Sequence, residues 1–339
     1  MIDLPLIWYF VLCAAVIFYA ILDGFDLGVG SLYLFFRKDQ ERRILLNSIG
    51  PVWDGNEVWL VVVLGALLAG FTPVYATLLT GFYTPTMILI FFLIFRAVAI
   101  EFRSKLPSPY WRSSWDCAFA FSSLAMAFVL GTGVGNLILG VPLTDDLVFV
   151  GSLSLFFRSD ALLVGVCAVS LFTMHGSAYL CMKTEGTLQN KMRRFALAAV
   201  ALFFVIYSLT TIDVLQKAPW MLAPFFRYPP LFILPVCALC AICFVPYCLY
   251  RRSFGYAFVY SSLSIALLLS LFGIGMFPYL LRSSRALEHS LTIYNAASSE
   301  KTLQILLTVA CIGLPLMFVY VYWVYRIFRG KVRLDKQSY

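Results

Sequence analysis

The sequence opens with MIDLPLIWYFVLCAAVIFYAILDGFDLGVG, residues 1–30, in which apolar side chains follow one another almost without a break. About twenty such residues in a helix cross the hydrocarbon core of a bilayer. The stretch lacks the basic start and the small-residue cleavage site of a signal peptide, and its apolar run continues for longer. We therefore expect an uncleaved first membrane span over residues 6–36.

The rest of the chain has the same character. Of its 339 residues, 62% are hydrophobic and 12% are charged, whereas soluble domains are roughly 45–50% apolar and about 25% charged. A soluble core of this length cannot hold the excess, so lipid must solvate much of it. The formal net charge of +8 lies in short runs between apolar stretches, which indicates membrane topology rather than nucleic-acid binding.

Apolar runs of span length recur along the chain and predict nine membrane helices. The runs lack the alternation of a membrane β-barrel, and only helices or closed barrels satisfy every backbone polar group within a bilayer. We therefore expect an all-α integral membrane fold that forms a single domain over residues 1–339. The predicted spans are residues 6–36, 44–71, 79–102, 115–140, 160–182, 195–215, 229–250, 255–281 and 302–327.

Basic residues are dense in every second loop. With the N-terminus in the periplasm and the C-terminus in the cytoplasm, 18 of the 25 lysines and arginines face inward, six face outward, and Arg96 lies within a span. The positive-inside rule supports both this orientation and the number of spans. The inward residues are Arg37, Lys38, Arg42, Arg43, Arg103, Lys105, Arg112, Lys183, Lys191, Arg193, Arg194, Arg251, Arg252, Arg326, Arg329, Lys331, Arg333 and Lys336.

Carboxylic acids lie within the first two predicted spans, where a charge is costly and usually functional. Asp23 and Asp26 belong to DGFDLGVG in the first span, and Asp54 and Glu57 belong to PVWDGNEVWL in the second. The members of each pair are three residues apart, so each pair shares one helix face. Gly24, beside the first pair, begins a GxxxG pattern that allows close approach of a second helix.

The depths of these groups follow from helical rise. Asp26 and Asp54 each lie eleven residues from a basic loop, so continuous helices would place both about 16 Å from the inner surface. Arg96, in the third span, would lie about 10 Å deep, with Glu101 near the inner mouth. Such a string of acids suits proton uptake. The alternative is an inert ion-pair network, with Arg96 and Glu57 paired, that holds the helices together.

Tryptophan and histidine give weaker signals. Trp53 and Trp59 flank the WDGNEVW segment and are expected to pack rather than to bind a ligand. The chain has two histidines, His175 in a span and His289 in an outer loop. A chain that held several haems would need more axial ligands, so we expect His175 to be a hydrogen-bonded core residue.

Three cysteines have the C-x2-C-x2-C spacing found in iron–sulfur sites. Cys237, Cys240 and Cys243 lie in an apolar helical run, and no further cysteine set completes a cluster. Packing as small hydrophobic side chains is the favoured interpretation. We expect no metal ion in this chain.

Several of these segments resemble subunit II of the cytochrome bd quinol oxidase family. The most specific are DGFDLGVG at 23–30 and NSIGPVWDGNEVWL at 47–60. The resemblance runs from Met1 to about Gly330. It also includes FRAVAIEFRSK at 95–105, GVGNLILGVP at 133–142, MFPYLLRSS at 276–284 and SLTIYNAASS at 290–299.

The resemblance implies a subunit of a quinol-oxidising, oxygen-reducing respiratory enzyme in the bacterial inner membrane. In the family, subunit II has nine helices, arranged as two four-helix bundles plus one peripheral helix. It packs against subunit I, which holds the b-type and d-type haems and the quinol-oxidation loop. Quinol and oxygen are substrates of the complex, and a bound quinone and a small accessory subunit are further candidates. No nucleic acid is expected.

The resemblance also suggests residue roles. It implies that Asp54, the acid of the WDG motif, lies on a proton route from the cytoplasm, accompanied by Asp26 and Asp23 of the DGFD motif. Glu101 matches an acidic family position. Of the two tryptophans, Trp53 corresponds to a residue near a quinone in some members, and Trp59 corresponds to one beside an apolar oxygen passage.

Two other functions fit the residues. A proton-coupled secondary transporter would also place acids near mid-membrane and would use helices broken around Pro51 and Gly55. The absence of repeated halves in the sequence argues against it. A purely structural scaffold for a redox partner differs from the oxidase hypothesis only in whether the acids are needed for turnover.

Overall fold

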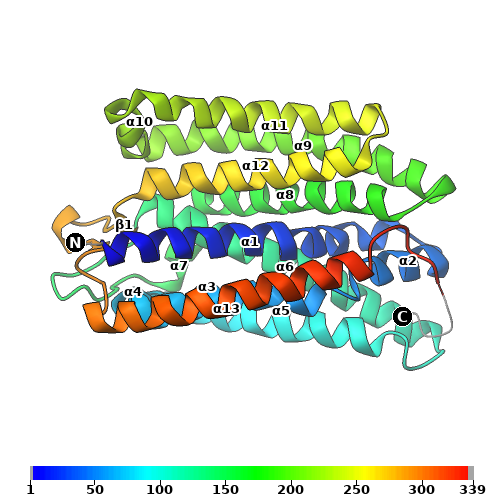
Figure 1. Ribbon diagram of the computed structural model, residues 1–339, viewed down its shortest axis with the longest axis horizontal. Helices are drawn as coiled ribbons and strands as arrows, with labels where there is room; N and C mark the ends of the chain where they lie inside the picture. Colours follow the sequence, from blue (N-terminus) through cyan, green and yellow to red (C-terminus); the bar gives the residue numbers. More distant parts are fainter. Residues whose placement is uncertain (1–2, 335–339) are drawn as a thin grey trace.

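The computed structural model describes residues 3–334 and is mostly helical (Figure 1). Within these residues, nine helices are long and apolar enough to cross a membrane. The predicted number of spans and the all-α membrane fold are therefore confirmed. The long helices are α1 (Leu4–Leu32), α3 (Trp53–Gly70), α5 (Tyr83–Phe102), α6 (Pro109–Leu139), α8 (Ser159–Lys183), α9 (Gly186–Lys217), α11 (Ile233–Tyr250), α12 (Phe254–Met276) and α13 (Glu300–Ile327).

The long helices run along one axis, and successive ones alternate in direction (Figure 1). Helices α1, α3, α5 and α6 pack as one set of neighbours, and α8, α9, α11 and α12 form a second set. The two sets meet where α8 packs against α1 and α6, while α13 lies against α3 and α1. These contacts fit the division into two four-helix bundles plus a peripheral helix, which stays a prediction.

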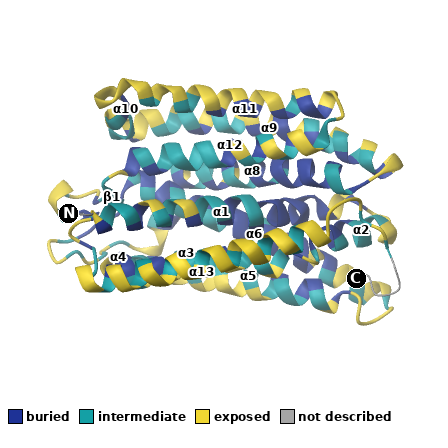
Figure 2. Cartoon of the chain, viewed as in Figure 1, coloured by how far each residue is buried: buried dark blue, intermediate teal, exposed yellow. Residues whose placement is uncertain are grey.

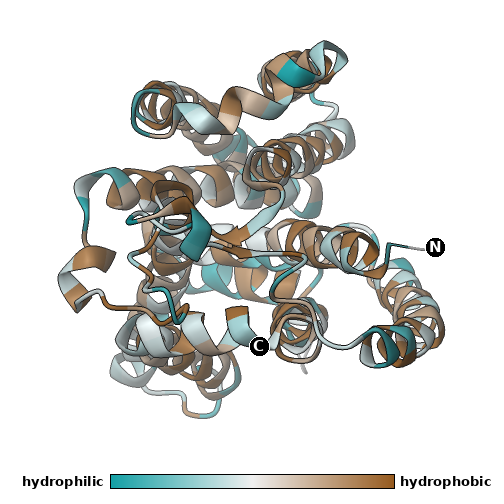
Figure 3. Ribbon diagram, turned by 90° about the vertical axis from the view of Figure 1, so that its left-hand side faces the viewer, coloured by the Kyte–Doolittle hydropathy of each residue, from teal (hydrophilic) through white to brown (hydrophobic). Residues whose placement is uncertain are grey.

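Burial within the protein is greatest along α1, α6 and α8 (Figure 2). Half of the most apolar stretch of α8 is buried, whereas none of the corresponding stretch of α13 is. Large apolar side chains such as Ile312 and Leu316 are exposed on α13. In the end-on view, hydrophobic residues also make up much of the outer helices (Figure 3). Such surfaces require lipid or another membrane subunit beside them.

Short elements close the two ends of the bundle. Near the N-terminus lie α4 (Thr72–Gly81), α7 (Leu153–Phe156), α10 (Ala223–Arg227) and an antiparallel pair of strands, β1 (Tyr279–Leu281) and β2 (Leu291–Thr292) (Figure 1). The opposite end, which we call the basic end, holds α2 (Asp39–Ile49), the α5–α6, α8–α9 and α11–α12 turns and the chain after α13. The segments rich in lysine and arginine therefore gather at one end. Lys336 lies outside the described residues.

The predicted helix over residues 44–71 is wrong at its start. Helix α2 ends at Ile49, and α3 begins only at Trp53. Pro51 has no backbone N–H to donate, so it cannot continue the helical hydrogen bonding, and the chain departs from helical geometry at Val52. The continuous helix from which the depth of Asp54 was calculated is therefore absent, because Asp54 lies in the first turn of a new helix. Its depth in the membrane stays a prediction.

Three other spans differ from their predicted bounds by five residues or more, and the first of them is α6, which begins at Pro109 rather than at residue 115. Helix α9 begins at Gly186, well before the predicted start at residue 195, because its polar first turns continue the helix beyond the apolar run. Helix α12 ends at Met276 rather than at residue 281. Pro278 follows shortly after, and proline cannot continue the helical hydrogen bonding.

Helices α1 and α8 cross in close contact at two glycines. A Cβ atom on Gly28 would clash with the backbone carbonyl oxygen of Phe172 and would lie 2.9 Å from the Cα of Gly176. A Cβ on Gly24 would lie 2.8 Å from the Phe172 ring. The close packing predicted from the GxxxG pattern is confirmed. The crossing also brings the acid-bearing turns of α1 into the centre of the molecule.

We expect Gly28→Ala to lower the stability of the protein by about 1–3 kcal/mol, the usual cost of overpacking, because backbone atoms must move to admit the methyl group. Thermal unfolding of the detergent-purified protein measures the change. Gly133→Ala in α6 is the matched control, since no atom lies within 4 Å of the added Cβ. Equal melting temperatures for the two variants would contradict the close crossing.

Candidate functional site

A buried arginine joins three helices. Arg96 of α5 places Nη2 2.5 Å from Oδ1 of Asp23 on α1 and 2.6 Å from Oε1 of Glu57 on α3. The contact with Asp23 is also a hydrogen bond, whereas the contact with Glu57 lacks hydrogen-bond geometry. Arg96 and Asp23 are fully buried, and the Glu57 side chain is 12% exposed. The structure therefore contains the expected pairing of Arg96 with Glu57 and adds Asp23 to it.

Asp26 is held by two residues that the sequence analysis missed. Asn56 Nδ2 donates hydrogen bonds to Oδ2 of Asp26 over 2.7 Å and to the Leu22 carbonyl over 3.1 Å. Tyr325 of α13 donates to Oδ1 of Asn56 over 2.8 Å. Asn56 is uncharged, so it did not stand out within WDGNEVW. Tyr325 lies 269 residues further along the chain, and no spacing rule connects the two.

Several buried atoms of this cluster have no hydrogen-bond partner within residues 3–334. They are Oδ2 of Asp23, Oδ1 of Asp26, and Nε and Nη1 of Arg96. Leaving a buried donor or acceptor unpaired costs about 1–3 kcal/mol, and more for a charged group. The cluster therefore has donors and acceptors that helix packing does not use, which is unusual for a purely structural ion-pair network.

Asp54 and Glu101 lie outside the cluster. Asp54 is exposed in the first turn of α3, two residues before Asn56. Glu101 is half-buried on α5, about 8 Å further toward the basic end than Arg96 by helical rise. The structure thus divides the predicted string of acids into a buried group around Arg96 and two outlying carboxyl groups.

Both tryptophans pack against apolar neighbours. Trp59 is buried and stacks on Phe18 with 4.6 Å between the ring centroids, and its ring lies 5.6 Å from that of Phe318. Trp53 is half-buried against the core around α2. The expected packing is confirmed for both, while contacts of Trp53 with quinone and of Trp59 with oxygen stay predictions.

His175 is the hydrogen-bonded core residue that the sequence predicted. Its Nδ1 lies 2.8 Å from Oγ of Ser261, and its Nε2 lies 2.9 Å from the carbonyl oxygen of Ile21. The imidazole also stacks on Phe258, with the ring centroids 4.9 Å apart. Because both ring nitrogens are engaged, the site does not fit axial ligation of a haem.

The cysteine run of α11 faces outward. Cys237, Cys240 and Cys243 are exposed and form no disulfide, so the expectation that they pack within the protein is wrong for this chain alone. Their three-residue spacing places them along one face of α11, and that face points away from the bundle. In the described part of the chain, no three His, Cys, Asp or Glu residues are placed to hold a metal ion.

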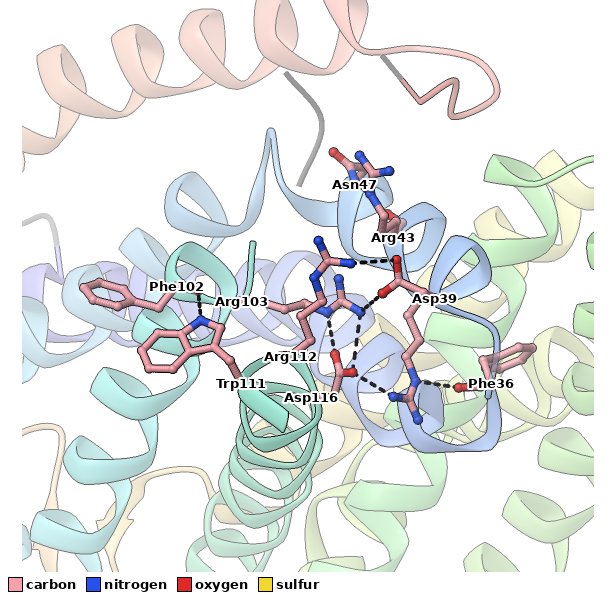
Figure 4. Close-up of polar contacts among 10 residues, drawn as sticks. Phe36, Asp39, Arg43, Asn47, Phe102, Arg103, Trp111, Arg112 and Asp116 are labelled. Carbon is pink, nitrogen blue, oxygen red and sulfur yellow. Dashed lines mark hydrogen bonds and ion pairs between the residues drawn. The ribbon is translucent and has the colours of Figure 1, made fainter. Parts of the chain in front are cut away.

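An ion-pair network closes the basic end (Figure 4). Buried Asp116 of α6 accepts hydrogen bonds from Nη1 of Arg42 over 2.7 Å and from Nε of Arg103 over 2.5 Å. Arg103 also donates to Oδ1 of Asp39 over 2.7 Å, and Arg112 lies 3.4 Å from the other oxygen of that carboxylate. The sequence analysis used these arginines only for topology. In the structure they fasten α2 to the α5–α6 turn.

These arginines change the titration of Asp39. Burial would raise its pKa, but the hydrogen bond from Arg103 and the nearby charges of Arg112 and Arg43 outweigh burial and lower the pKa below 3.8. The folded protein therefore binds the charged form of Asp39 better than the unfolded chain does, which stabilises the fold above this pH.

A cavity of about 440 Å³ lies at the basic end, between the α2–α3 turn and the ends of α8 and α13. Its lining includes Ser48, Tyr179 and Tyr325, and the Tyr179 hydroxyl donates to the Ser48 carbonyl over 2.7 Å. Tyr325 is also the residue that bonds to Asn56. One side chain therefore connects the cavity with the buried cluster.

The chain after α13 is fastened over this cavity by two lysines. Lys183, at the end of α8, donates to the carbonyl of Phe328 over 2.7 Å. In the reverse direction, Lys331 donates to the carbonyl of Met182 over 2.7 Å. Because both amino groups are engaged with backbone carbonyls, the segment is held against the end of α8.

Comparison with known proteins agrees with these features. The family model for cytochrome bd terminal oxidase subunit II matches residues 4–328. The chain belongs to this family. It is therefore a component of a quinol oxidase complex that includes subunit I, and a multi-pass membrane protein. This membership favours the oxidase function over the transporter alternative.

Relatives of this subunit II are similar over nearly their whole length. Subunit 2 of the Escherichia coli (strain K12) cytochrome bd-I ubiquinol oxidase is 33% identical, with 97% of this chain and 95% of the relative covered. Subunit 2 of the Bacillus subtilis (strain 168) cytochrome bd ubiquinol oxidase is 32% identical, with 96% of each covered. A chain of the bd oxidase structure from Geobacillus thermodenitrificans shares the fold, with a TM-score of 0.79, 19% identity and coverage of 96% of this chain and 99% of that one.

We expect Arg96→Gln to destabilise this subunit by about 3–5 kcal/mol, because it leaves Asp23 and Glu57 without their buried counter-charge. Chemical unfolding of the purified complex in detergent measures the loss. Adding Asp23→Asn to this variant should recover part of it, since one uncompensated carboxylate is then removed. Strictly additive losses in the double variant would show that the two residues do not interact.

We expect Asp39→Asn to make the protein less sensitive to acid. The stabilisation by Asp39 is present at neutral pH and is lost as the pH falls below 3.8 toward the lowered pKa of the folded state. Because the Asp39 side chain is 48% exposed, the effect should be about 1 kcal/mol or less. Melting temperatures between about pH 6 and pH 3 measure it, with the exposed Asp146→Asn as control. The same acid-induced loss in both variants would contradict the assignment.

Proposed function

We propose that this chain is the haem-free subunit of a bd-type quinol:oxygen oxidoreductase in the bacterial inner membrane. In this proposal it supports assembly with haem-bearing subunit I and carries part of the proton-uptake route. The basic end faces the cytoplasm and the N-terminus faces the periplasm, in keeping with the positive-inside rule. The observation that carries the proposal is the hydrogen-bonded chain beside the basic-end cavity, in which Tyr325 orients Asn56 and Asn56 orients the carboxyl group of Asp26.

Haems b and d, bound by subunit I, would supply electron transfer and the reduction of oxygen to water, which consumes protons. This chain's part is to deliver protons from the cytoplasmic side. The Tyr325 hydroxyl lies at the cavity, and Asn56 holds one oxygen of Asp26, which leaves the other free to accept a proton. From Asp26 the route continues to Asp23 beside Arg96.

The charge of the cluster favours this role. Three carboxyl groups, those of Asp23, Asp26 and Glu57, share the buried space with one guanidinium group, that of Arg96. One cation cannot balance three anions, and an unbalanced charge away from water is costly. The cluster reaches neutrality by taking up protons, so it can hold them in transit.

Asp54 supports the assembly part of the proposal. Its carboxylate is exposed on α3, close to the level at which Asn56 reaches Asp26. A carboxylate at this depth is unfavourable toward lipid. We therefore assign the face formed by α3 and α13 to subunit I, which would cover Asp54 and extend the proton route. Glu101 is a second acid on the cytoplasmic approach.

Oxygen access is assigned to the aromatic cluster of α1, α3 and α13. Trp59, Phe18 and Phe318 are in aromatic contact with one another, and such apolar surroundings suit a small uncharged molecule. Trp53, near the start of α3, is the candidate contact for a bound quinone. Both assignments rest on the family resemblance, supported by the apolar surroundings of the two side chains.

We expect Asp26→Asn to slow quinol-driven oxygen consumption at least about ten-fold, because loss of a positioned proton acceptor usually costs more than this. The assembled complex should keep its haem content, since an amide oxygen at position 26 still accepts the hydrogen bond from Asn56. Asp54→Asn should also slow turnover. Oxygen uptake by the purified complex and its dithionite-reduced spectrum measure both properties.

Asp145→Asn is the control, because Asp145 is exposed at the end of the bundle opposite the basic end. Proton uptake is followed in liposomes with a pH dye trapped on the cytoplasmic side of the enzyme. Full activity of Asp26→Asn with normal haem content would reduce the buried acids to a structural scaffold. Loss of haem in that variant, together with loss of activity, would point to an assembly defect instead of a proton block.

A further inference from the structure

A second cavity at the basic end lies away from the proton route. It has a volume of about 410 Å³ and is lined by Asn190, Arg193, Arg194, Leu197 and Arg252. The first four follow the i, i+3, i+4, i+7 spacing of one helix face, so they form a single stripe on the first turns of α9. Arg252 comes from the α11–α12 turn and faces that stripe across the cavity.

The side chain of Arg193 and the backbone of Arg252 are fixed in place. Arg193 Nε donates to the carbonyl of Leu249, near the end of α11, over 2.9 Å. Its guanidinium carbon lies 5.9 Å from the centroid of the Tyr250 ring. Arg252 has a φ of 59°, and the bond from Ser253 N–H to the Cys248 carbonyl, over 2.9 Å, closes its tight turn.

The positive charge of this cavity is not balanced by an ion pair within the described residues. None of the ion pairs among residues 3–334 includes Arg193, Arg194 or Arg252. The lysines of the larger cavity differ, because Lys183 and Lys331 are engaged with backbone carbonyls. Three guanidinium groups around one cavity match a phosphate, whose oxygens accept paired N–H donors.

The surroundings identify the source of the phosphate as a lipid. The arginine stripe of α9 continues into exposed apolar residues on the same helix face, namely Phe204, Val205 and Ile212. Exposed side chains of α11 run alongside, and this side of the molecule is exposed over most of its length (Figure 2). Basic pockets between membrane helices at the level of the headgroups suit anionic phospholipids. Helices α9 and α11, at whose basic ends the lining residues lie, are on the opposite side of the bundle from α3 and α13 (Figure 1).

We propose that Arg193, Arg194 and Arg252 bind the phosphate of an anionic phospholipid, whose acyl chains lie along α9 and α11. The site is separate from the buried acids, so it is not a step in proton transfer. It fastens the outer helices α9, α11 and α12 to the leaflet at the basic end. If this lipid site were disproved, the proposed proton route would be unaffected.

The test uses the complex purified with its partner and washed extensively in detergent, after which bound lipids are extracted and counted by mass spectrometry. We expect the wild-type complex to retain phosphatidylglycerol or cardiolipin, and Arg194→Gln with Arg252→Gln to retain several-fold less. Arg193 is left unchanged because its Nε supports α11. Arg37→Gln with Lys38→Gln removes two exposed charges elsewhere at the basic end and should leave lipid retention unchanged.

Adding single lipids or inorganic phosphate back to the washed complex distinguishes the sources of phosphate. Phosphatidylglycerol should raise the melting temperature of the wild type by a few degrees, while phosphatidylcholine and inorganic phosphate should not. The double arginine variant should show no such rise, although its haem spectrum remains normal. An equal rise with inorganic phosphate would make this a soluble-anion site and overturn the lipid assignment. Equal lipid retention in variant and wild type would overturn the site itself.

Discussion

The structure depends on the burial of one positive charge. Among the described residues, Arg96 is the largest fully buried side chain, and it lies within a span, where a charge is costly unless it is paired. Asp23 and Glu57, on other helices, supply the carboxylates that pair with it. Helices α1, α3 and α5 therefore have one relative position in which this charge is matched, and the neighbouring elements pack around that arrangement.

Close backbone contact between α1 and α8 fixes the two sets of helices against each other. At Gly28 and Gly176 the backbones of α1 and α8 touch. This close packing, together with the contact between His175 and the Ile21 carbonyl, fixes the second set of helices against the first. The network around Asp116 then ties α2 and the α5–α6 turn together at the basic end. Charge pairing near the bundle centre and at its end, with close packing between, stabilises a protein whose long helices expose many large apolar side chains.

Much of this architecture could be predicted from the sequence, because length and hydropathy determine membrane spans almost directly. The nine helices, the acids of the first spans and the hydrogen-bonded role of His175 followed from composition and spacing. The break at Pro51 was treated as part of a continuous span, since the apolar pattern continues across it. The exposure of Asp54 could not be predicted, because periodicity alone does not say which face of a helix meets a neighbour.

The polar partners were the least predictable part of the site. Asn56 carries no charge, and Tyr325 is one of 19 tyrosines in the chain, so neither stood out before the fold placed them beside Asp26. Asp39 and Asp116 were hidden for another reason. They lie among arginines that were counted as markers of topology, and their pairing depends on how two turns meet in space.

The bond between Tyr325 and Asn56 has a consequence for biosynthesis. A ribosome makes the chain from its N-terminus, so Asp23, Asp26, Glu57 and Arg96 can meet as soon as the first three spans have entered the membrane. The Tyr325 hydroxyl is delivered only with the last helix, 269 residues after Asn56. A truncated or half-inserted chain therefore contains the acid cluster but not its link to the basic-end cavity, so the proposed proton route would be incomplete until translation is finished.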